Sequence, residues 1–198
     1  MNIDWAEHSA EYQWHQWRSQ GLGGSDAPIL LGISPWKDIH NLLLEKTGEP
    51  DSSSGWDFAT ARGKELEPIV REKVNRLIGV KFEPAQLISR INPIFRANVD
   101  GIFERYIIEI KCPGKIDHGI ALSGQIPEKY IPQCQWLMLV AEIEVMDYVS
   151  WDGKSEDPVF VKCVRDQAMI DKLTQRALLF WDMVTARKEF LIKNKANF

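Results

Sequence analysis

The hydrophobic residues between positions 56 and 78 recur at helical spacing, which predicts the main helix of the domain. Gly79 follows the last of them and is placed to end the helix. Pro68 removes one helical hydrogen bond, so we expect a kink or local unwinding around Lys64 and Glu67. The shared apolar face consists of Leu66, Ile69, Val70, Val74, Leu77 and Ile78.

After Gly79 the pattern changes to short apolar segments bounded by Pro, Asn or Gly, which is typical of strands. The predicted strands span residues 80–90, 94–103, 105–113, 144–151 and 158–164. The first three follow one another directly, which favours an antiparallel meander. Helical patterns return within residues 115–142 and over residues 166–193. This order of elements predicts an α/β fold with a central mixed β-sheet flanked by α-helices.

The N-terminal part of the chain is predicted to be helical. A helix over residues 6–20 places Trp14 and Trp17 on one face and ends at Gly21. A third helix is expected to begin with Ser34 as its N-cap and to end at Thr47–Gly48. Residues 49–55 form the clearest predicted loop of the chain.

Between these two helices lies the glycine-rich segment GLGGSDAPILLG. Ser25 or Asp26 can cap a short helix here, because Pro28 lies in its first turn. Gly23 and Gly24 would let the backbone approach a ligand closely. A helix N-terminus preceded by glycines is also a favourable place for an anion.

Composition restricts the class of protein. A chain of 198 residues with 44% hydrophobic residues can bury one real core. It contains no run of about twenty apolar residues and no signal-peptide pattern at its start, so we expect a soluble, cytosolic protein. Neither the cysteines nor the histidines have metal-site spacing, and the histidines are expected at the surface. The residues concerned are Cys112, Cys134, Cys163, His8, His15, His40 and His118.

The formal net charge is -4, which gives no support for a nucleic-acid partner. Residues 1–60 contain nine acidic residues and only three basic ones, Arg18, Lys37 and Lys46. Any phosphate-binding face must therefore be built locally.

The informative chemical motif is Asp100 followed by Glu109 and Lys111, at the spacing D-x8-E-x-K. On a strand, Glu109 and Lys111 project from one face while Ile108 and Ile110 project from the other into the core. A turn through Glu104 and Arg105 would bring Asp100, at the end of the preceding strand, beside Glu109. Two carboxylates and the Ile110 carbonyl suit Mg²⁺ or Mn²⁺. Lys111 would then orient or help deprotonate an attacking water.

The motif also has a simpler interpretation, in which Asp100 is a turn residue and the Glu109–Lys111 pair is a solvated strand face. Against it, Ile107, Ile108 and Ile110 make the strand apolar enough to be central, and central strands rarely expose Glu and Lys without a reason.

Beyond this motif, an ordered set of segments resembles the YqaJ-like viral recombinase, or phage lambda-type alkaline exonuclease, family of the PD-(D/E)xK nuclease superfamily. The segments are GLGGSDAPILLGISPW, LEKTG, ARGKELEP, ANVDGIF, IIEIKCP and YIPQCQWLM. The resemblance runs from about Trp14 to Trp151 and implies a restriction-endonuclease-like core. It implies one nuclease domain over residues 1–198. Within it, the N-terminal helices of residues 1–55 would carry a 5′-phosphate site, residues 56–165 would form the catalytic core and residues 166–198 a C-terminal helix.

The same resemblance implies roles for individual residues. Asp100, Glu109 and the Ile110 carbonyl would hold metal, and Lys111 would be the catalytic lysine. Glu67 would complete the metal site through water; the simpler alternative is an exposed carboxylate paired with Lys64 or Arg71, and the place of Glu67 beside Pro68 and the order of the motifs favour the metal role.

Residues outside the acidic motif also match the family. Gln133 matches a glutamine beside the active site, with Gln135 and Tyr130 as weaker candidates. Arg18 and Ser25 match the pair that binds the terminal 5′-phosphate, against the simpler possibility of capping by Ser25 and solvation of Arg18. Trp36 and Trp56 could stack on bases, and Lys115 could meet a phosphate, but core positions for the rings and solvent for the lysine are commoner.

The implied function is a Mg²⁺-dependent exonuclease, with Mn²⁺ as a possible substitute and two ions per site. It would digest one strand of linear double-stranded DNA from the 5′ end to 5′-mononucleotides, leaving 3′ tails for phage-type recombination. The resemblance further implies a ring-shaped homotrimer, a single-strand annealing protein as partner and work in a bacterial cytoplasm. No GxxxxGK[ST] motif occurs, in agreement with ATP independence. A structure- or sequence-specific PD-(D/E)xK endonuclease and a non-catalytic DNA-end-binding module remain as alternatives.

Overall fold

The computed structural model describes the backbone of residues 10–50 and 58–195 and the side chains of residues 13–50 and 62–194. His8, Trp56 and most of the predicted 49–55 loop lie outside the described residues.

One sheet of five strands forms the centre of the described chain, in the order β1-β2-β3-β4-β5. The strands are β1 (Glu83–Ile88), β2 (Arg96–Phe103), β3 (Tyr106–Lys111), β4 (Val145–Ser150) and β5 (Val159–Val164). The first three form the predicted antiparallel meander, β3 and β4 are parallel, and β4 and β5 are antiparallel. The predicted α/β class with a mixed sheet is confirmed.

The central strand β3 is buried on both faces. Ile108 and Ile110 pack in one core cluster with Val70 and Val74 of α4 (Phe58–Ile78). Ile107 belongs to the larger cluster on the other face, which includes α6 (Ile131–Ala141). The predicted alternation along β3 is therefore confirmed, and it directs Glu109 and Lys111 away from α4.

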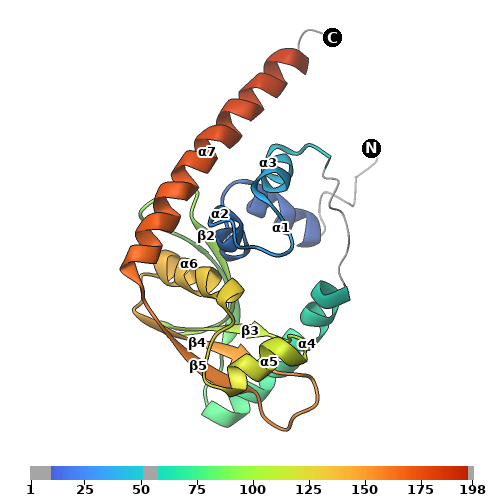
Figure 1. Cartoon of the computed structure of the whole chain (residues 1–198), viewed down its shortest axis with the longest axis vertical. Helices are drawn as coiled ribbons and strands as arrows, with labels where there is room; N and C mark the ends of the chain where they lie inside the picture. Colours follow the sequence, from blue (N-terminus) through green and yellow to red (C-terminus); the bar gives the residue numbers. More distant parts are fainter. Residues whose placement is uncertain (1–9, 51–57, 196–198) are drawn as a thin grey trace.

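The remaining helices surround the sheet, as Figure 1 shows. The N-terminal helices α1–α3 lie between α6 and the middle of α7, which runs past them and extends beyond the body of the molecule (Figure 1). Their bounds are α1 (Ala10–Ser19), the 3-10 helix η2 (Gly24–Asp26), α2 (Ala27–Leu30) and α3 (Ile39–Thr47). The others are α5 (Lys115–Leu122), the 3-10 helix η3 (Glu128–Tyr130) and α7 (Gln167–Lys195). Among the described residues, no helix is both long and apolar enough to cross a membrane.

One of the two predictions about helix N-caps was wrong. The N-cap of α3 is Asp38, whose side chain accepts a hydrogen bond from Asn41 N, whereas Ser34 Oγ accepts from Trp36 N and Lys37 N in the preceding turn. For α2 the N-cap is Asp26, one of the two residues predicted, although its side chain makes no capping hydrogen bond, and the Ser25 hydroxyl accepts from Arg18 instead.

Three other local predictions need correction. Helix α4 continues through Pro68, so the local unwinding expected there is absent, while a kink stays a prediction. Asp100 lies within β2, which runs on to Phe103. His118 is not a surface residue: its side chain is buried, and its Nδ1 lies 2.9 Å from Ser150 Oγ because α5 packs over the end of β4.

Candidate active site

The carboxylates of Asp100 and Glu109 come together where β2 and β3 lie side by side. Asp100 Oδ2 accepts a hydrogen bond of 2.7 Å from the backbone N–H of Ile110. Arg71 of α4 donates both to the Asp100 carbonyl, at 2.6 Å, and to Glu67, at 2.8 Å. The position of Asp100 is thus fixed through its side chain and its backbone.

Glu109 is almost fully buried, with 1% of its side chain exposed. Its Oε1 accepts from Lys111 Nζ at 2.5 Å and from the amide of Gln133 on α6. Its Oε2 is buried and has no hydrogen-bond partner in the described part of the chain. A buried carboxylate oxygen without a partner is costly, which is expected of an atom that receives a ligand absent from the structure.

Burial and mutual repulsion set the charges of the site. Burial, followed by the neighbouring Glu109, raises the pKa of Asp100 well above its usual value. Burial likewise raises the pKa of Glu109, and Lys111 offsets only part of this effect. For Lys111 burial alone would lower the pKa, but the two carboxylates outweigh it and the pKa is raised. Lys111 is therefore an ammonium that donates hydrogen bonds.

This donor set suits a hard divalent cation. The carboxylates of Asp100 and Glu109 both have a raised pKa, and one oxygen of Glu109 has no hydrogen-bond partner within the described residues. A cation would relieve the repulsion between the two carboxylates. Within residues 13–50 and 62–194, however, no three His, Cys, Asp or Glu side chains gather around one point. Glu67 is paired with Arg71, the alternative weighed from the sequence, so its contact with metal through water stays a prediction.

Metal affinity is expected to rise with pH. Carboxylates must be deprotonated to bind a cation, and the raised pKa values of Asp100 and Glu109 move that deprotonation upward from its usual range. Calorimetric titration of the protein with Mn²⁺ between about pH 5 and pH 8 should show tighter binding at each higher pH. An affinity independent of pH over this range would contradict the assignment.

Arg18 and Ser25 are brought together, as the resemblance implied. Arg18 Nη1 donates to Ser25 Oγ at 2.9 Å, and the guanidinium lies over the ring of Trp14, 5.5 Å from its centroid. One cavity of about 150 Å³ is lined by both residues and by Asp100, Glu109 and Lys111. The candidate phosphate pair and the candidate metal carboxylates thus face a common space.

An ion-pair network that sequence reasoning missed holds Arg18 in place. Asp26 is fully buried and accepts from Arg18 at 2.8 Å and from Lys46 at 2.9 Å. Glu45 accepts from Arg18 at 3.1 Å and from Lys37 at 2.8 Å. Burial would raise the pKa of Asp26, but Lys46 and Arg18 outweigh it and the pKa is lowered.

The three basic residues of positions 1–60 therefore share one cluster with two carboxylates, and the local excess of positive charge is a single unit. The only sequence signal was the opposite charge of Asp26 in GGSD and Lys46 in LEKTG.

Gly24 sets the distance between the phosphate pair and the carboxylates. A Cβ atom at this position would lie 3.1 Å from Leu137 Cδ2 and 3.2 Å from Gln133 Cγ, both on α6. Glycine therefore lets the loop before Ser25 pack directly on α6. Gly23 and Gly24 also line the cavity, and the predicted close approach of a ligand to them stays a prediction.

Two weaker candidates lie apart from this cavity. Gln135 is buried and bridges Val164 O and Asp166 N at the start of α7, so it has no part in the site. Lys115 is exposed at the first turn of α5. Tyr130, by contrast, lies beside Lys111, whose Nζ is 5.6 Å from the ring centroid.

The fold and the acidic motif define a class. A mixed five-stranded sheet flanked by helices, with Asp100, Glu109 and Lys111 on adjacent strands, is the PD-(D/E)xK-like core. Residues 13–144 match the YqaJ-like viral recombinase domain, and the chain belongs to this family. A relative, the uncharacterized protein YqaJ of Bacillus subtilis (strain 168), is 31% identical over 176 residues, which make up 86% of this chain and 55% of that protein. The chain thus spans about half the length of this curated relative.

Solved structures share the fold. The alkaline exonuclease LHK-Exo of Laribacter hongkongensis superposes with a TM-score of 0.77 at 23% identity, over 93% of this chain and 98% of that one. The same protein in complex with dAMP gives 0.75, with the same identity and coverage. A phage-related exonuclease of Haemophilus somnus 129PT gives 0.61 at 15% identity, over 84% and 96% of the two chains.

Proposed function

We propose that the protein is a Mg²⁺-dependent exonuclease that digests one strand of linear double-stranded DNA from its 5′ end. The observation that carries the proposal is the shared cavity, in which Arg18 and Ser25 face the carboxylates of Asp100 and Glu109. An anion site beside a metal site suits a strand whose terminal phosphate is held while the next phosphodiester is cut. The fold shared with an alkaline exonuclease and with a phage-related exonuclease supports the same conclusion.

Each side chain has a role in this reaction. Asp100, Glu109 and the Ile110 carbonyl would hold Mg²⁺, with Mn²⁺ as a substitute, and one or two ions would stabilise charge on the scissile phosphate and lower the pKa of a nearby water. Lys111, an ammonium, orients the attacking water. Gln133 holds Glu109 in position. Water attacks phosphorus, the bond to the 3′ oxygen breaks, and a 5′-mononucleotide leaves.

Hydrolysis in this direction also regenerates the ligand of the phosphate pair. The phosphate that was cut stays on the shortened strand as its new 5′-phosphate, which Arg18 and Ser25 can bind in the next cycle. The guanidinium and hydroxyl provide charge-assisted hydrogen bonds for such a group. Repetition would leave the long 3′ single-stranded tails that recombination by strand annealing requires.

Digestion of a linear duplex labelled at either strand tests the function. We expect loss of label from the 5′ end first, release of mononucleotides, no activity in EDTA and no attack on closed circles. Cutting of closed circles would favour the endonuclease alternative, and loss from the 3′ end would contradict the proposed direction. A DNA-end-binding module would bind the duplex without shortening it.

Replacement of Arg18 by alanine should remove the preference for a 5′-phosphate. Binding of a terminal phosphate gains roughly 1.5–3 kcal/mol from a charged hydrogen bond, so we expect about a tenfold or greater loss of rate on phosphorylated ends. Ends that carry a 5′-hydroxyl should be cut at a rate much less affected. Equal loss on both kinds of end would show that Arg18 supports the fold and not the phosphate.

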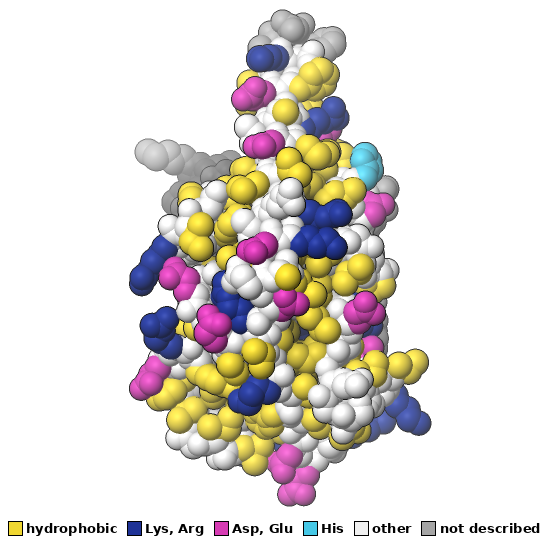
Figure 2. Space-filling model, turned by 60° about the vertical axis from the view of Figure 1, so that its left-hand side comes forward, with side chains coloured by type: hydrophobic (Ala, Val, Ile, Leu, Met, Phe, Trp, Pro, Cys, Tyr) yellow, Lys and Arg dark blue, Asp and Glu magenta, His cyan; other side chains and the backbone are white. Residues whose placement is uncertain are grey.

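We further propose, from the family resemblance, a ring-shaped homotrimer that works with a single-strand annealing protein in the cytoplasm of a bacterial host. Exposed apolar residues on α7, which projects from the body in Figure 2, offer a surface for assembly. They are Leu178, Leu179, Met183, Phe190 and Ile192. Native mass spectrometry of the full chain would test the trimer.

A further inference from the structure

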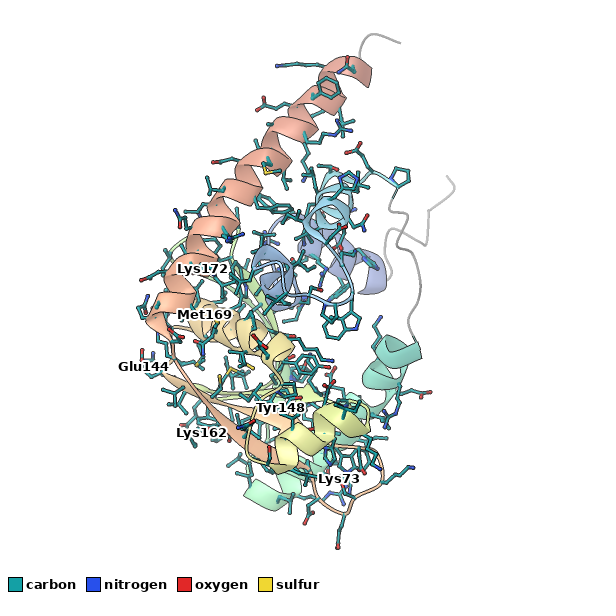
Figure 3. The ribbon with its side chains drawn as sticks, viewed as in Figure 1. Lys73, Glu144, Tyr148, Lys162, Met169 and Lys172 are labelled. Carbon is teal, nitrogen blue, oxygen red and sulfur yellow. The ribbon has the colours of Figure 1, made fainter. Side chains whose placement is uncertain are left out.

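A column of three aromatic rings runs from the catalytic strands to the surface. Tyr148 is fully buried in β4, directly opposite Glu109 of β3 in the strand register, and Figure 3 places it in the interior beneath α6. Tyr130 stacks on it with ring centroids 5.8 Å apart and planes at 27°. Trp36 stacks on Tyr130 in turn, at 5.9 Å and 28°. Both pairs have the geometry of offset stacking.

Trp36 ends this column in solvent, with 53% of the residue exposed. The turn that carries it is fixed, because Ser34 Oγ accepts hydrogen bonds from the backbone N–H groups of Trp36 and Lys37, each at 3.3 Å. A large ring that is held on one side and open to solvent is already ordered for a flat ligand. Little side-chain entropy would be lost when such a ligand stacks on it.

Lysines flank the column at two levels. Lys129 Nζ lies 5.1 Å from the Trp36 ring and 5.3 Å from the Tyr130 ring, and Asp117 holds it at 2.7 Å. Lys111 Nζ lies 5.6 Å from the Tyr130 ring. Aromatic faces combined with cations are how proteins bind single nucleic-acid strands without regard to sequence, since every base has a π-face and every nucleotide a phosphate. A purely apolar protein partner would not need the cations.

We propose that Trp36 is a base-stacking platform that receives one nucleobase of the DNA near the scissile phosphate. This inference rests on the proposed function. Because the column begins beside Glu109 and passes Lys111, the stacked base belongs to a nucleotide close to the one being cut. Stacking on Trp36 takes that base out of the duplex and keeps the two strands apart at the point of cleavage.

Binding to DNA ends that lack single bases tests the platform. All proteins tested carry Asp100→Asn so that the DNA stays intact. The probes are a series of 5′-phosphorylated duplexes, each with a single tetrahydrofuran abasic site at a different distance from the end of one strand or the other. The protein with Trp36 should lose roughly tenfold in affinity at one or two positions, within the range known for base–aromatic stacking. Trp36→Ala should bind intact DNA weaker by a similar factor and be indifferent to the abasic site there. Trp36→Phe should retain part of the discrimination.

A matched control is Ile91→Ala, which removes an apolar side chain that is 68% exposed between β1 and β2. It should leave the abasic profile unchanged. If Trp36→Ala shows the same profile as its parent, or binds intact DNA equally well, the platform is wrong, including the case in which Trp36 contacts a protein partner instead. Degradation of linear DNA by the wild-type chain is measured separately. If the wild type cuts DNA but the abasic profile does not depend on Trp36, the stacking proposal is wrong and the proposed nuclease function still stands.

Discussion

Replacement of Lys111 by alanine should abolish DNA degradation while binding of DNA ends is kept. Lys111 provides a positive charge next to the metal carboxylates and orients the attacking water, and removal of one such electrostatic group typically costs about 100- to 1000-fold in rate. Its neighbours should stay folded, because the loss of the ammonium leaves Glu109 with the amide of Gln133. The measurement is single-turnover digestion of a 5′-labelled duplex, with binding of the same duplex measured in EDTA and in metal.

A matched control for this variant is Lys172→Ala. Lys172 is exposed on α7, and Figure 3 shows it away from Tyr148, the strand neighbour of Glu109. Its removal should leave the rate near that of the wild type. An unchanged rate in Lys111→Ala would refute a catalytic role and would favour the DNA-end-binding module. A loss of binding equal to the loss of rate would assign Lys111 to the grip on DNA.

Replacement of Lys46 by methionine should be the most destabilising single change in the N-terminal helices. It keeps the length of the side chain but leaves the buried carboxylate of Asp26 with Arg18 alone. Leaving a buried charge without any partner costs about 3–5 kcal/mol, and the cost here should approach this range from below because Arg18 still contacts Asp26 at 2.8 Å. The free energy of unfolding in urea, measured at neutral pH, gives the cost directly.

A second variant separates charge from packing. Asp26→Asn combined with Lys46→Met removes both charges of the buried pair, and we expect it to regain a substantial part of the lost stability. Lys81→Met, which breaks an exposed pair with Glu83, serves as the surface comparison and should leave the urea transition unchanged. If the double variant is no more stable than Lys46→Met, packing and not charge explains the loss.

Strand alternation gave the most reliable information about the site. Ile108 and Ile110 could share one buried face only if Glu109 and Lys111 shared the opposite face, and the structure has them so. Alternation could not place Asp100 in the middle of β2, because Gly101 directly after it is also typical of a turn. Gly101 is required for another reason: a Cβ there would lie 2.7 Å from Ile108 Cγ1 across the strand pair.

Contacts between segments that are distant in the sequence could not be predicted from local sequence patterns. The pairing of Asp26 with Lys46 depends on how α3 folds back on the glycine-rich loop, which no periodicity records. Arg18 and Ser25 were assigned through the family resemblance, and the physical argument alone favoured solvation of Arg18. The start of α3 was ambiguous, because Ser34 and Asp38 can both cap a helix and stand four residues apart. Asp38 is the N-cap in the structure, and the Ser34 hydroxyl accepts a hydrogen bond within the preceding turn.

The tight packing of Gly24 on α6 fixes a distance within the site. It fixes the span from the phosphate pair on the N-terminal loop to Glu109, because the same α6 residue that touches Gly24 also holds that carboxylate. Under the proposed function, this span decides how many nucleotides separate the held end from the cut bond. Product length would then be a property of one glycine contact and not of the chemistry of hydrolysis, and a bulkier residue at this position would change the length of what is released.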